Sequence, residues 1–245
     1  MRLTSRRALA AVAIASTAGI GFSSVAVAGD EPEGDTWRGT PRADQYIGTR
    51  HGDVAAGRGG PDAMQGRRGT DWLLGNAGWD NLSGGLGSDV IWGGAGSDLT
   101  TGGDAADYIL EGGADDRVNG AAGGDWILVG TGSDVVQAGA GRDFLIVFSD
   151  DDPDTLQCGE GRDLVAYLEA RDAADRHRGC EQKYEFEELE KLVESGEVTI
   201  PPFPPVLEAT MEVVEKESAK RAPRGQMTRQ KALRWSVRQL RASAE

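Results

Sequence analysis

An aspartate recurs at every ninth position through the middle of this chain. The series is unbroken and reads Asp44, Asp53, Asp62, Asp71, Asp80, Asp89, Asp98, Asp107, Asp116, Asp125, Asp134 and Asp143. A fixed short period is the signature of a solenoid, because one such unit buries too little apolar surface alone and must stack on its neighbours. The chain is therefore predicted to fold by stacking copies of a nine-residue unit.

Glycines and apolar residues keep the same register as the aspartates. Glycine stands five residues before the aspartate at Gly39, Gly48, Gly57, Gly66, Gly75, Gly84, Gly93, Gly102 and Gly120. It stands two residues before the aspartate at Gly60, Gly69, Gly78, Gly87, Gly96, Gly123, Gly132 and Gly141. With a mostly apolar residue U two positions after the aspartate, the unit is G-G-x-G-x-D-x-U-x, complete at residues 84–92. The glycines permit a sharp turn, and the last three residues alternate, which predicts a short strand whose U side chain points inward.

The aspartate adds a carboxylate to a glycine turn whose backbone carbonyls face inward. Carboxylate and carbonyl oxygens are the ligands of Ca²⁺, which takes about six to eight of them. The net charge of −14 fits either cation binding or an ordinary solvated surface, so charge alone does not decide between them. A metal-free solenoid is the alternative, but stacked carboxylates repel one another when no cation lies between them.

This unit resembles the haemolysin-type (RTX) calcium-binding repeat over about residues 39–146, with a weaker continuation to Asp163. The resemblance implies an all-β fold, a right-handed parallel β-roll in which two nonapeptides make one coil. It also implies that Ca²⁺ lies between turns one coil apart, held by aspartates and glycine-turn carbonyls of both turns. One row of ligands would be Asp62, Asp80, Asp98, Asp116 and Asp134. The opposite row would be Asp71, Asp89, Asp107, Asp125 and Asp143.

Several repeats depart from the consensus. The third glycine is replaced by Arg42, His51, Ala105 and Ala114, and the first glycine by Glu111, Val129 and Ala138. Arg58 and Arg67 stand where small residues are usual, and their charge would oppose a nearby cation. Asp44 and Asp53, in the repeats of Arg42 and His51, are therefore weaker ligand candidates.

The nine-residue repeats also alternate between two types, which gives a second period of eighteen residues. In alternate repeats the two residues that flank U are apolar or aromatic: Val54 and Ala56, Trp72 and Leu74, Val90 and Trp92, Tyr108 and Leu110, Trp126 and Leu128, and Phe144 and Ile146. In the other repeats most of the flanking residues are polar. Two strands per coil would place them on two sheets, one facing water and one presenting an aromatic face. An apolar face of this size is rarely exposed. The alternatives are that the C-terminal segment covers it, or that it binds a second copy in a homodimer, a protein partner or a glycan.

The first residues have the composition of an export signal. Residues 1–28 combine a basic start, a short interrupted apolar run and Ala26-Val27-Ala28, which predicts a signal peptide cut after Ala28 and a secreted, extracellular protein. An uncleaved anchor is the alternative. The Arg6-Arg7 pair also allows the twin-arginine route, although a roll that needs external calcium favours the general route. No transmembrane segment is predicted elsewhere, and residues 29–38 are a linker.

The chain after the repeats is predicted to close the roll and then leave it. The roll spans 39–166, and Cys158 and Cys180 are expected to form a disulfide at its end, with free thiols as the alternative. Residues 167–200 form a helical cap, with a helix over 181–195 that stops at Gly196. Residues 201–245 combine a Pro-rich linker, a second helical segment and a basic tail. That tail could bind the acidic roll or an anionic cell surface, or remain solvated.

Three classes of function compete. An enzyme is not predicted, because the repeats leave little chain for a catalytic domain and neither an H-E-x-x-H zinc helix nor a G-x-S-x-G elbow is present. An acidic roll also argues against nucleic acid. The predicted function is a secreted calcium-binding protein that folds on Ca²⁺. A calcium-dependent adhesion or partner-binding module that uses the aromatic face is the alternative.

Overall fold

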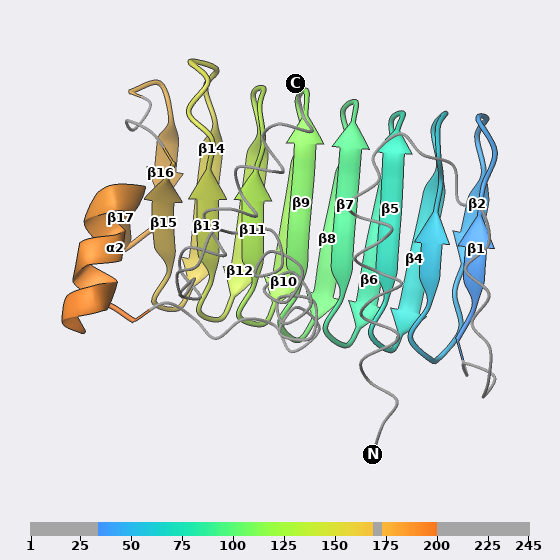
Figure 1. The fold of residues 1–245 in the computed structure, drawn as a ribbon, viewed down its shortest axis with the longest axis horizontal. Helices are drawn as coiled ribbons and strands as arrows, with labels where there is room; N and C mark the ends of the chain where they lie inside the picture. Colours follow the sequence, from blue (N-terminus) through green and yellow to red (C-terminus); the bar gives the residue numbers. More distant parts are fainter. Residues whose placement is uncertain (1–33, 169–172, 200–245) are drawn as a thin grey trace, which may run out of the picture. The chain divides into compact units, whose positions relative to one another are not determined.

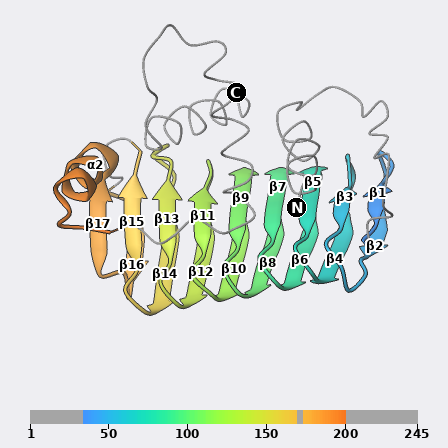
Figure 2. The same cartoon turned by 60° about the horizontal axis from the view of Figure 1, so that its bottom comes forward.

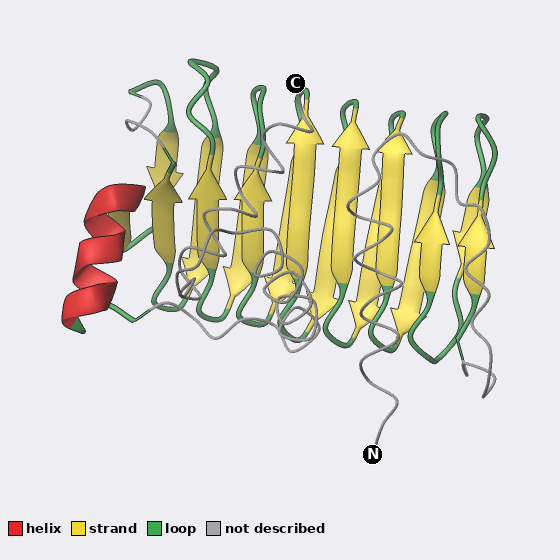
Figure 3. Ribbon diagram, viewed as in Figure 1, coloured by secondary structure: helices red, strands yellow, loops and turns green. Residues whose placement is uncertain are grey.

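The computed structural model describes residues 34–168 and 173–199, all within one compact unit (Figure 1). They form an all-β solenoid of two parallel sheets, with a single helix in the described part (Figure 3). The nine-stranded sheet contains β1 (Thr36–Arg38), β3 (Val54–Ala56), β5 (Trp72–Ala77), β7 (Val90–Ala95), β9 (Tyr108–Gly113), β11 (Trp126–Val129), β13 (Phe144–Val147), β15 (Leu164–Tyr167) and β17 (Gln182–Glu185). The eight-stranded sheet contains β2 (Gln45–Ile47), β4 (Ala63–Arg68), β6 (Asn81–Leu86), β8 (Leu99–Asp104), β10 (Arg117–Ala122), β12 (Val135–Ala140), β14 (Thr155–Glu160) and β16 (Arg176–Arg178).

Consecutive strands alternate between the two sheets, and Figure 2 shows odd-numbered and even-numbered strands in separate layers. Neighbours within a sheet are parallel and eighteen residues apart, as in the pairing of Trp72 with Val90 and of Val90 with Tyr108. Two nonapeptides therefore make one coil, as the resemblance implies.

Most of the strands are longer than the three residues predicted from the alternation, whereas β1, β2, β3 and β16 have the predicted length. Strand β7, for example, runs from Val90 through Gly93 and Gly94 to Ala95. The first two glycines of such a repeat thus extend the preceding strand, and only the rest of the G-x-G-x-D segment makes the turn. The short-strand prediction was wrong for these strands because parallel pairing uses backbone groups, which glycine supplies as well as any other residue.

Most turns use left-handed backbone at two positions, four and two residues before the aspartate, although the first two turns, before Asp44 and Asp53, do not. Glycine supplies it in most repeats, as at Gly94 (φ 112°) and Gly96 (φ 118°). Where glycine is absent the conformation is kept by Arg58, Arg67, Asn76, Ala105, Ala114 and Ala121. An L-residue pays about 1–2 kcal/mol for this region, so the stack imposes the turn on these residues against their own preference.

Inside the roll, the U side chains form the core in two clusters. The N-terminal cluster contains Tyr46, Ala55, Met64, Leu73, Leu82 and Ile91. The C-terminal cluster contains Ile109, Val118, Ile127, Val129, Val136, Ala138, Leu145, Val147, Leu156, Cys158, Val165, Tyr167 and Cys180. Between them the U position is Thr100, which is buried but polar. The C-terminal cluster is wider because a second inward column, glycine in most earlier repeats, is apolar there.

The two sheets extend beyond the expected boundaries of 39–166. Strands β16 and β17 continue them at the C-terminal end: Thr155 pairs with Arg176 after an insertion, whereas Leu164 pairs with Gln182 at the usual eighteen residues. The helix expected over 181–195 was therefore wrong at its start, since residues 182–185 pair with β15. Helix α2 (Phe186–Ser195) begins after them and ends at left-handed Gly196 (φ 80°), as predicted.

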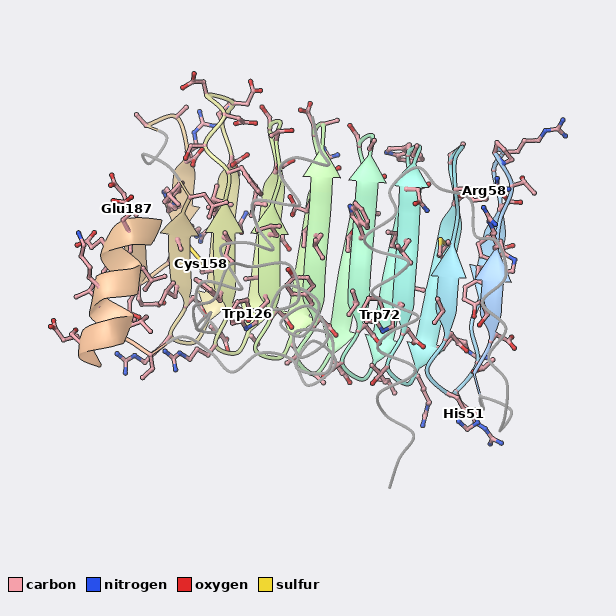
Figure 4. All side chains as sticks on the ribbon, viewed as in Figure 1. His51, Arg58, Trp72, Trp126, Cys158 and Glu187 are labelled. Atoms are coloured by element: carbon pink, nitrogen blue, oxygen red, sulfur yellow. A yellow bond between two sulfur atoms is a disulfide. The ribbon has the colours of Figure 1, made fainter. Side chains whose placement is uncertain are left out.

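The C-terminal end is fastened in two ways. Cys158 and Cys180 form the expected disulfide, 22 residues apart, with 5.0 Å between their Cα atoms (Figure 4). Closing a loop of this length contributes about 3 kcal/mol in the chain-entropy model. Helix α2 contacts β15 and β17, so it covers that end of the nine-stranded sheet. The predicted signal peptide, the second helical segment and the basic tail lie outside the described residues.

The outer faces of the two sheets differ as the eighteen-residue period predicts. On the nine-stranded sheet, whose Trp72 and Trp126 are labelled in Figure 4, Trp126 and Phe144 are each 1 % exposed and meet edge to face with ring centroids 4.7 Å apart. On the eight-stranded sheet, Asn81 and Arg117 are exposed. Within residues 34–168 and 173–199, no helix has the length and apolar character needed to cross a membrane.

The strained turns predict an unusual effect of glycine substitution. Ala105→Gly and Ala114→Gly should each raise the free energy of unfolding by about 1 kcal/mol, because glycine adopts the left-handed region without strain. Ala140→Gly is the matched control. Ala140 is exposed on β12 without positive φ, so the same change there should lower stability by about 0.5–1 kcal/mol. Urea unfolding in saturating calcium measures all three, and destabilisation at all three positions would contradict the assignment.

Candidate metal centre

The aspartates tie each coil to the next. The backbone N–H of Asp80 donates to Oδ1 of Asp98 (2.8 Å), and that of Asp89 donates to Oδ1 of Asp107 (2.8 Å). The same bond between residues eighteen apart recurs along both edges of the roll, from Asp35 and Asp44 at one end to Asp125 and Asp116 at the other. Alternate aspartates therefore stack in two ladders, one along each row of turns.

The second carboxylate oxygen, Oδ2, is left over. This oxygen is buried, and no described residue donates a hydrogen bond to it, in each of the following ten aspartates: Asp62, Asp71, Asp80, Asp89, Asp98, Asp107, Asp116, Asp125, Asp134 and Asp143. These ten residues are the ones predicted from the sequence as ligands. A buried carboxylate oxygen without a donor is costly, and a cation is the natural compensation. The residues present therefore fit Ca²⁺.

Room for an ion comes from the first glycine of the repeat. A Cβ on Gly93 would lie 2.6 Å from Oδ2 of Asp98 and 2.7 Å from the carbonyl oxygen of Glu111. A Cβ on Gly102 would lie 2.5 Å from Oδ2 of Asp107 and 2.7 Å from the Gly120 carbonyl oxygen. An aspartate oxygen and a carbonyl of the next coil thus converge at each such glycine. Both are hard oxygen ligands of the kind Ca²⁺ takes.

Burial dominates the electrostatics of these carboxylates. It raises the pKa of Asp89 to about 7, of Asp116 to about 8 and of Asp107 to about 9. Repulsion between aspartates one coil apart raises the same pKa values further, while the ladder hydrogen bonds lower them. Without a cation, the ladder therefore favours protonated aspartates.

The first turns at the N-terminal end are closed by the protein's own donors. Oδ2 of Asp44 accepts the backbone N–H of Thr40 (2.6 Å), and Oδ2 of Asp53 accepts that of Thr49 (2.7 Å). The guanidinium of Arg67 donates to the carbonyl oxygen of Gly48 at 3.4 Å, which places positive charge at a turn carbonyl. These contacts agree with Asp44 and Asp53 being weaker candidates.

Sequence reasoning missed several members of the ladders. Asp35 could have been found, because it stands nine residues before Asp44 and its N–H donates to Asp53. Asp175 and Glu181 accept the backbone N–H groups of Asp154 (3.0 Å) and Asp163 (3.1 Å). Asp175 follows an insertion that breaks the period, so spacing carried no signal for it, whereas Glu181 stands eighteen residues after Asp163 and could have been found.

Glu111 is the other residue missed, since it was treated only as a lost glycine. One carboxylate oxygen each from Glu111, Asp116 and Asp134 lie within 4.8 Å of one another, and all three residues are buried. The inward direction of its side chain, which the two-residue alternation of the strand implies, could have found it.

The raised pKa values predict that acid can partly replace calcium. In the unfolded chain these aspartates have pKa values near about 4, so the calcium-free roll binds more protons than the unfolded chain between about pH 4 and pH 9. Stability from this source is present at low pH and is lost as the pH rises through the folded pKa values. In chelator, far-UV circular dichroism should therefore show more β structure at about pH 5 than at about pH 8. A calcium-free chain equally folded at both values would contradict the burial of these groups.

Comparison with known proteins agrees with this geometry. A family model described as the RTX calcium-binding nonapeptide repeat (4 copies) matches residues 47–78, 74–109 and 112–145. No curated protein matches the chain. The matched residues span β3 to β12, apart from residues 110 and 111, and contain all ten aspartates. The chain therefore carries RTX calcium-binding nonapeptide repeats, and Ca²⁺ is the ion that such repeats bind.

Proposed function

We propose that this protein is a secreted calcium-binding protein whose roll folds when calcium enters the turns between coils. The observation that carries the proposal is that each of the ten predicted ligands has a buried Oδ2 atom that no described residue satisfies, as Asp163 and Asp175 also have. The Oδ1 atoms of the same residues are satisfied within the ladders, so the second oxygen is free to serve an ion without loss of coil-to-coil contact.

The ligands follow from this arrangement. The row on one edge is Asp62, Asp80, Asp98, Asp116 and Asp134, and the row on the other is Asp71, Asp89, Asp107, Asp125 and Asp143. Turn carbonyls of the neighbouring coil, such as that of Gly120 beside Asp107, complete the oxygen set. Asp44 and Asp53 are not ligands in this proposal, because Thr40 and Thr49 already occupy their Oδ2 atoms.

Folding and binding are one process in this proposal. Where calcium is scarce, packing the coils would bury charged carboxylates without partners, and the repeats stay unfolded. Where calcium is at millimolar concentration, the ions bridge successive coils, and their binding free energy becomes folding free energy. Extracellular calcium modules bind calcium with dissociation constants of about 10⁻⁴–10⁻³ M. With such an affinity the repeats would be calcium-free where calcium is scarce and loaded where it is millimolar.

Export rests on the N-terminal segment and on the disulfide. Residues 1–28 have the composition of a signal peptide, and RTX repeats are typical of secreted proteins. The Cys158–Cys180 disulfide supports an oxidising compartment, because such bonds are rare in the cytosol. The proposed place of action is therefore extracellular.

A binding role is favoured over a catalytic one, since the matched repeats are calcium-binding repeats. Adhesion through the aromatic face has less support. Trp126 and Phe144, towards its C-terminal end, are each 1 % exposed and present little surface to a glycan, to a second copy or to another protein. Trp72, Trp92 and Tyr108 on the same face are half-buried.

An isosteric substitution separates the two roles of a ladder aspartate. In Asp98→Asn the remaining oxygen can still accept the Asp80 N–H, but the ion loses a charged ligand. We expect fewer bound ions and a calcium midpoint roughly fivefold to tenfold higher. Asp44→Asn is the matched control and should leave the number of bound ions unchanged. Equilibrium dialysis counts the ions, and an unchanged count in Asp98→Asn would remove Asp98 from the ligand set.

Calcium titration of the chain from Gly29 onward tests the function itself. Far-UV circular dichroism should show a cooperative gain of β structure with calcium. It should show none with magnesium at the same concentration, because Mg²⁺ demands octahedral geometry and gives up its water reluctantly. A spectrum indifferent to calcium would refute calcium-driven folding.

A further inference from the structure

Glu111 stands where the repeat calls for its first glycine. It lies on β9, five residues before Asp116, in an inward-facing column of the nine-stranded sheet. The pairing of β9 with its neighbours places Gly93 beside it on β7 and Val129 beside it on β11. Its side chain therefore points into the roll at the level of the turns.

The carboxylate of Glu111 is buried without a well-formed hydrogen bond. The residue is 1 % exposed, and Oε1 and Oε2 have no hydrogen-bond partner of good geometry among the described residues, although the Gly130 N–H and the Asp134 carboxyl lie close enough to affect its pKa. Oδ2 of Asp116 and Oδ2 of Asp134 are buried in the same condition. Three acceptors facing one another inside a protein repel, unless a cation or a proton lies among them.

The spacing of these oxygens suits a cation. One oxygen from each carboxylate lies within 4.8 Å of the others. Ca²⁺ binds oxygen at about 2.3–2.6 Å, so two ligands of one ion lie at most about 5 Å apart. The backbone keeps its usual path, because a Cβ on Gly93 in the preceding coil would lie 2.7 Å from the Glu111 carbonyl oxygen, much as one on Gly75 would lie 2.6 Å from that of Gly93. Glu111 therefore adds a third carboxylate beside Asp116 and Asp134 without displacing the chain.

The surrounding charge strengthens the same site. Repulsion by Asp115 and Asp150 contributes to the raised pKa of Asp134. Both carboxylates are fixed by backbone donors of the next turn, Asp115 by the N–H of Ser133 (3.0 Å) and Asp150 by that of Gly132 (2.6 Å). They cannot turn away without losing these bonds, so the negative potential at this turn is built in.

Glu111 also marks a boundary in the roll. Before it, the inward column contains Gly57, Gly75 and Gly93, each beside a ladder aspartate. After it, the column contains Val129, Val147 and Tyr167, which are fully buried members of the C-terminal apolar cluster. An ion at Glu111 would thus lie next to the part of the roll that apolar packing and the disulfide hold together. Fewer groups have to be ordered there when the ion binds.

We propose that Glu111 is a side-chain ligand of a calcium ion held between Asp116 and Asp134, and that this ion binds more tightly than the others and loads first. The inference rests on the proposed calcium function and adds to it a site of different composition. Affinity in calcium sites is tuned by the number of charged ligands and by rigidity, and both are greatest at this turn.

Two substitutions at Glu111 and one control test the proposal in the full-length chain. Glu111→Gln keeps the size of the side chain and removes its charge, while Glu111→Gly restores the consensus of the repeat and so preserves the turn. Glu160→Gln removes the same charge from an exposed position on β14. Calcium isotherms are measured by competition with a chromophoric chelator.

The wild-type chain should hold one ion at a free calcium concentration about tenfold below that needed for the rest. Both Glu111 variants should lose this tight step and keep the weaker ones, and Glu160→Gln should keep it. A wild-type isotherm without a tight step would overturn the proposal. A Glu111→Gln variant that keeps the tight binding step of the wild type would overturn it too. That result is expected if Glu111 and Asp134 share a proton. If the wild type and all variants give the same calcium isotherm, only this inference fails. If none of them binds calcium, the proposed calcium function fails as well.

Discussion

The hydrogen bond from one aspartate N–H to the Oδ1 of the aspartate one coil later is the contact on which the rest of the roll depends. It sets the register of the coils along both edges, as between Asp80 and Asp98 or Asp89 and Asp107. It also orients each carboxylate, so that Oδ2 lies inside the turn beside the first glycine. One residue type thereby performs two tasks, spacing the coils with one oxygen and presenting the other to an ion. Asparagine could do the first task but would weaken the second.

The roll stabilises its interior in two ways, and their shares change along the stack. Where the inner column is glycine, the apolar core is a single file of U side chains. Where the column is Val129, Ala138, Val147, Cys158 or Tyr167, its side chains join the apolar cluster, which is wider there, while Asp134 and Asp143 beside it still have buried Oδ2 atoms without a donor. The column changes from glycine at Glu111 on one edge and at Ala138 on the other. Thr100, polar in the core just before it, separates the two clusters.

Much of this architecture could be predicted from the nine-residue period, because every step of the solenoid depends on the same short unit. The solenoid follows from it, and the different faces of the two sheets follow from the alternation of the repeats, while two nonapeptides per coil and the stacking of alternate aspartates were implied by the resemblance to RTX repeats. The strand ends could not be predicted, since glycines such as Gly93 carry no side-chain alternation to read. Strand β16 and Asp175 were hidden by an insertion that changes the spacing, whereas Glu181 keeps the eighteen-residue spacing but replaces the aspartate. Glu111 was missed because a departure from a consensus shows only what is lost, while its partners Asp116 and Asp134 become visible only in three dimensions.

The insertions fall on one edge of the roll. Pairing steps of twenty and twenty-one residues replace the usual eighteen where β13 leads to β14 and β15 leads to β16, and Figure 1 shows the longer loops there. The strands on either side keep their alignment, with Phe144 opposite Leu164 and Leu145 opposite Val165. The length of a loop on this edge is thus independent of the spacing between coils, since extra residues loop outward without changing the distance between coils. A peptide grafted between Val147 and Asp154 would be displayed at the side of the stack while both sheets kept their pairing.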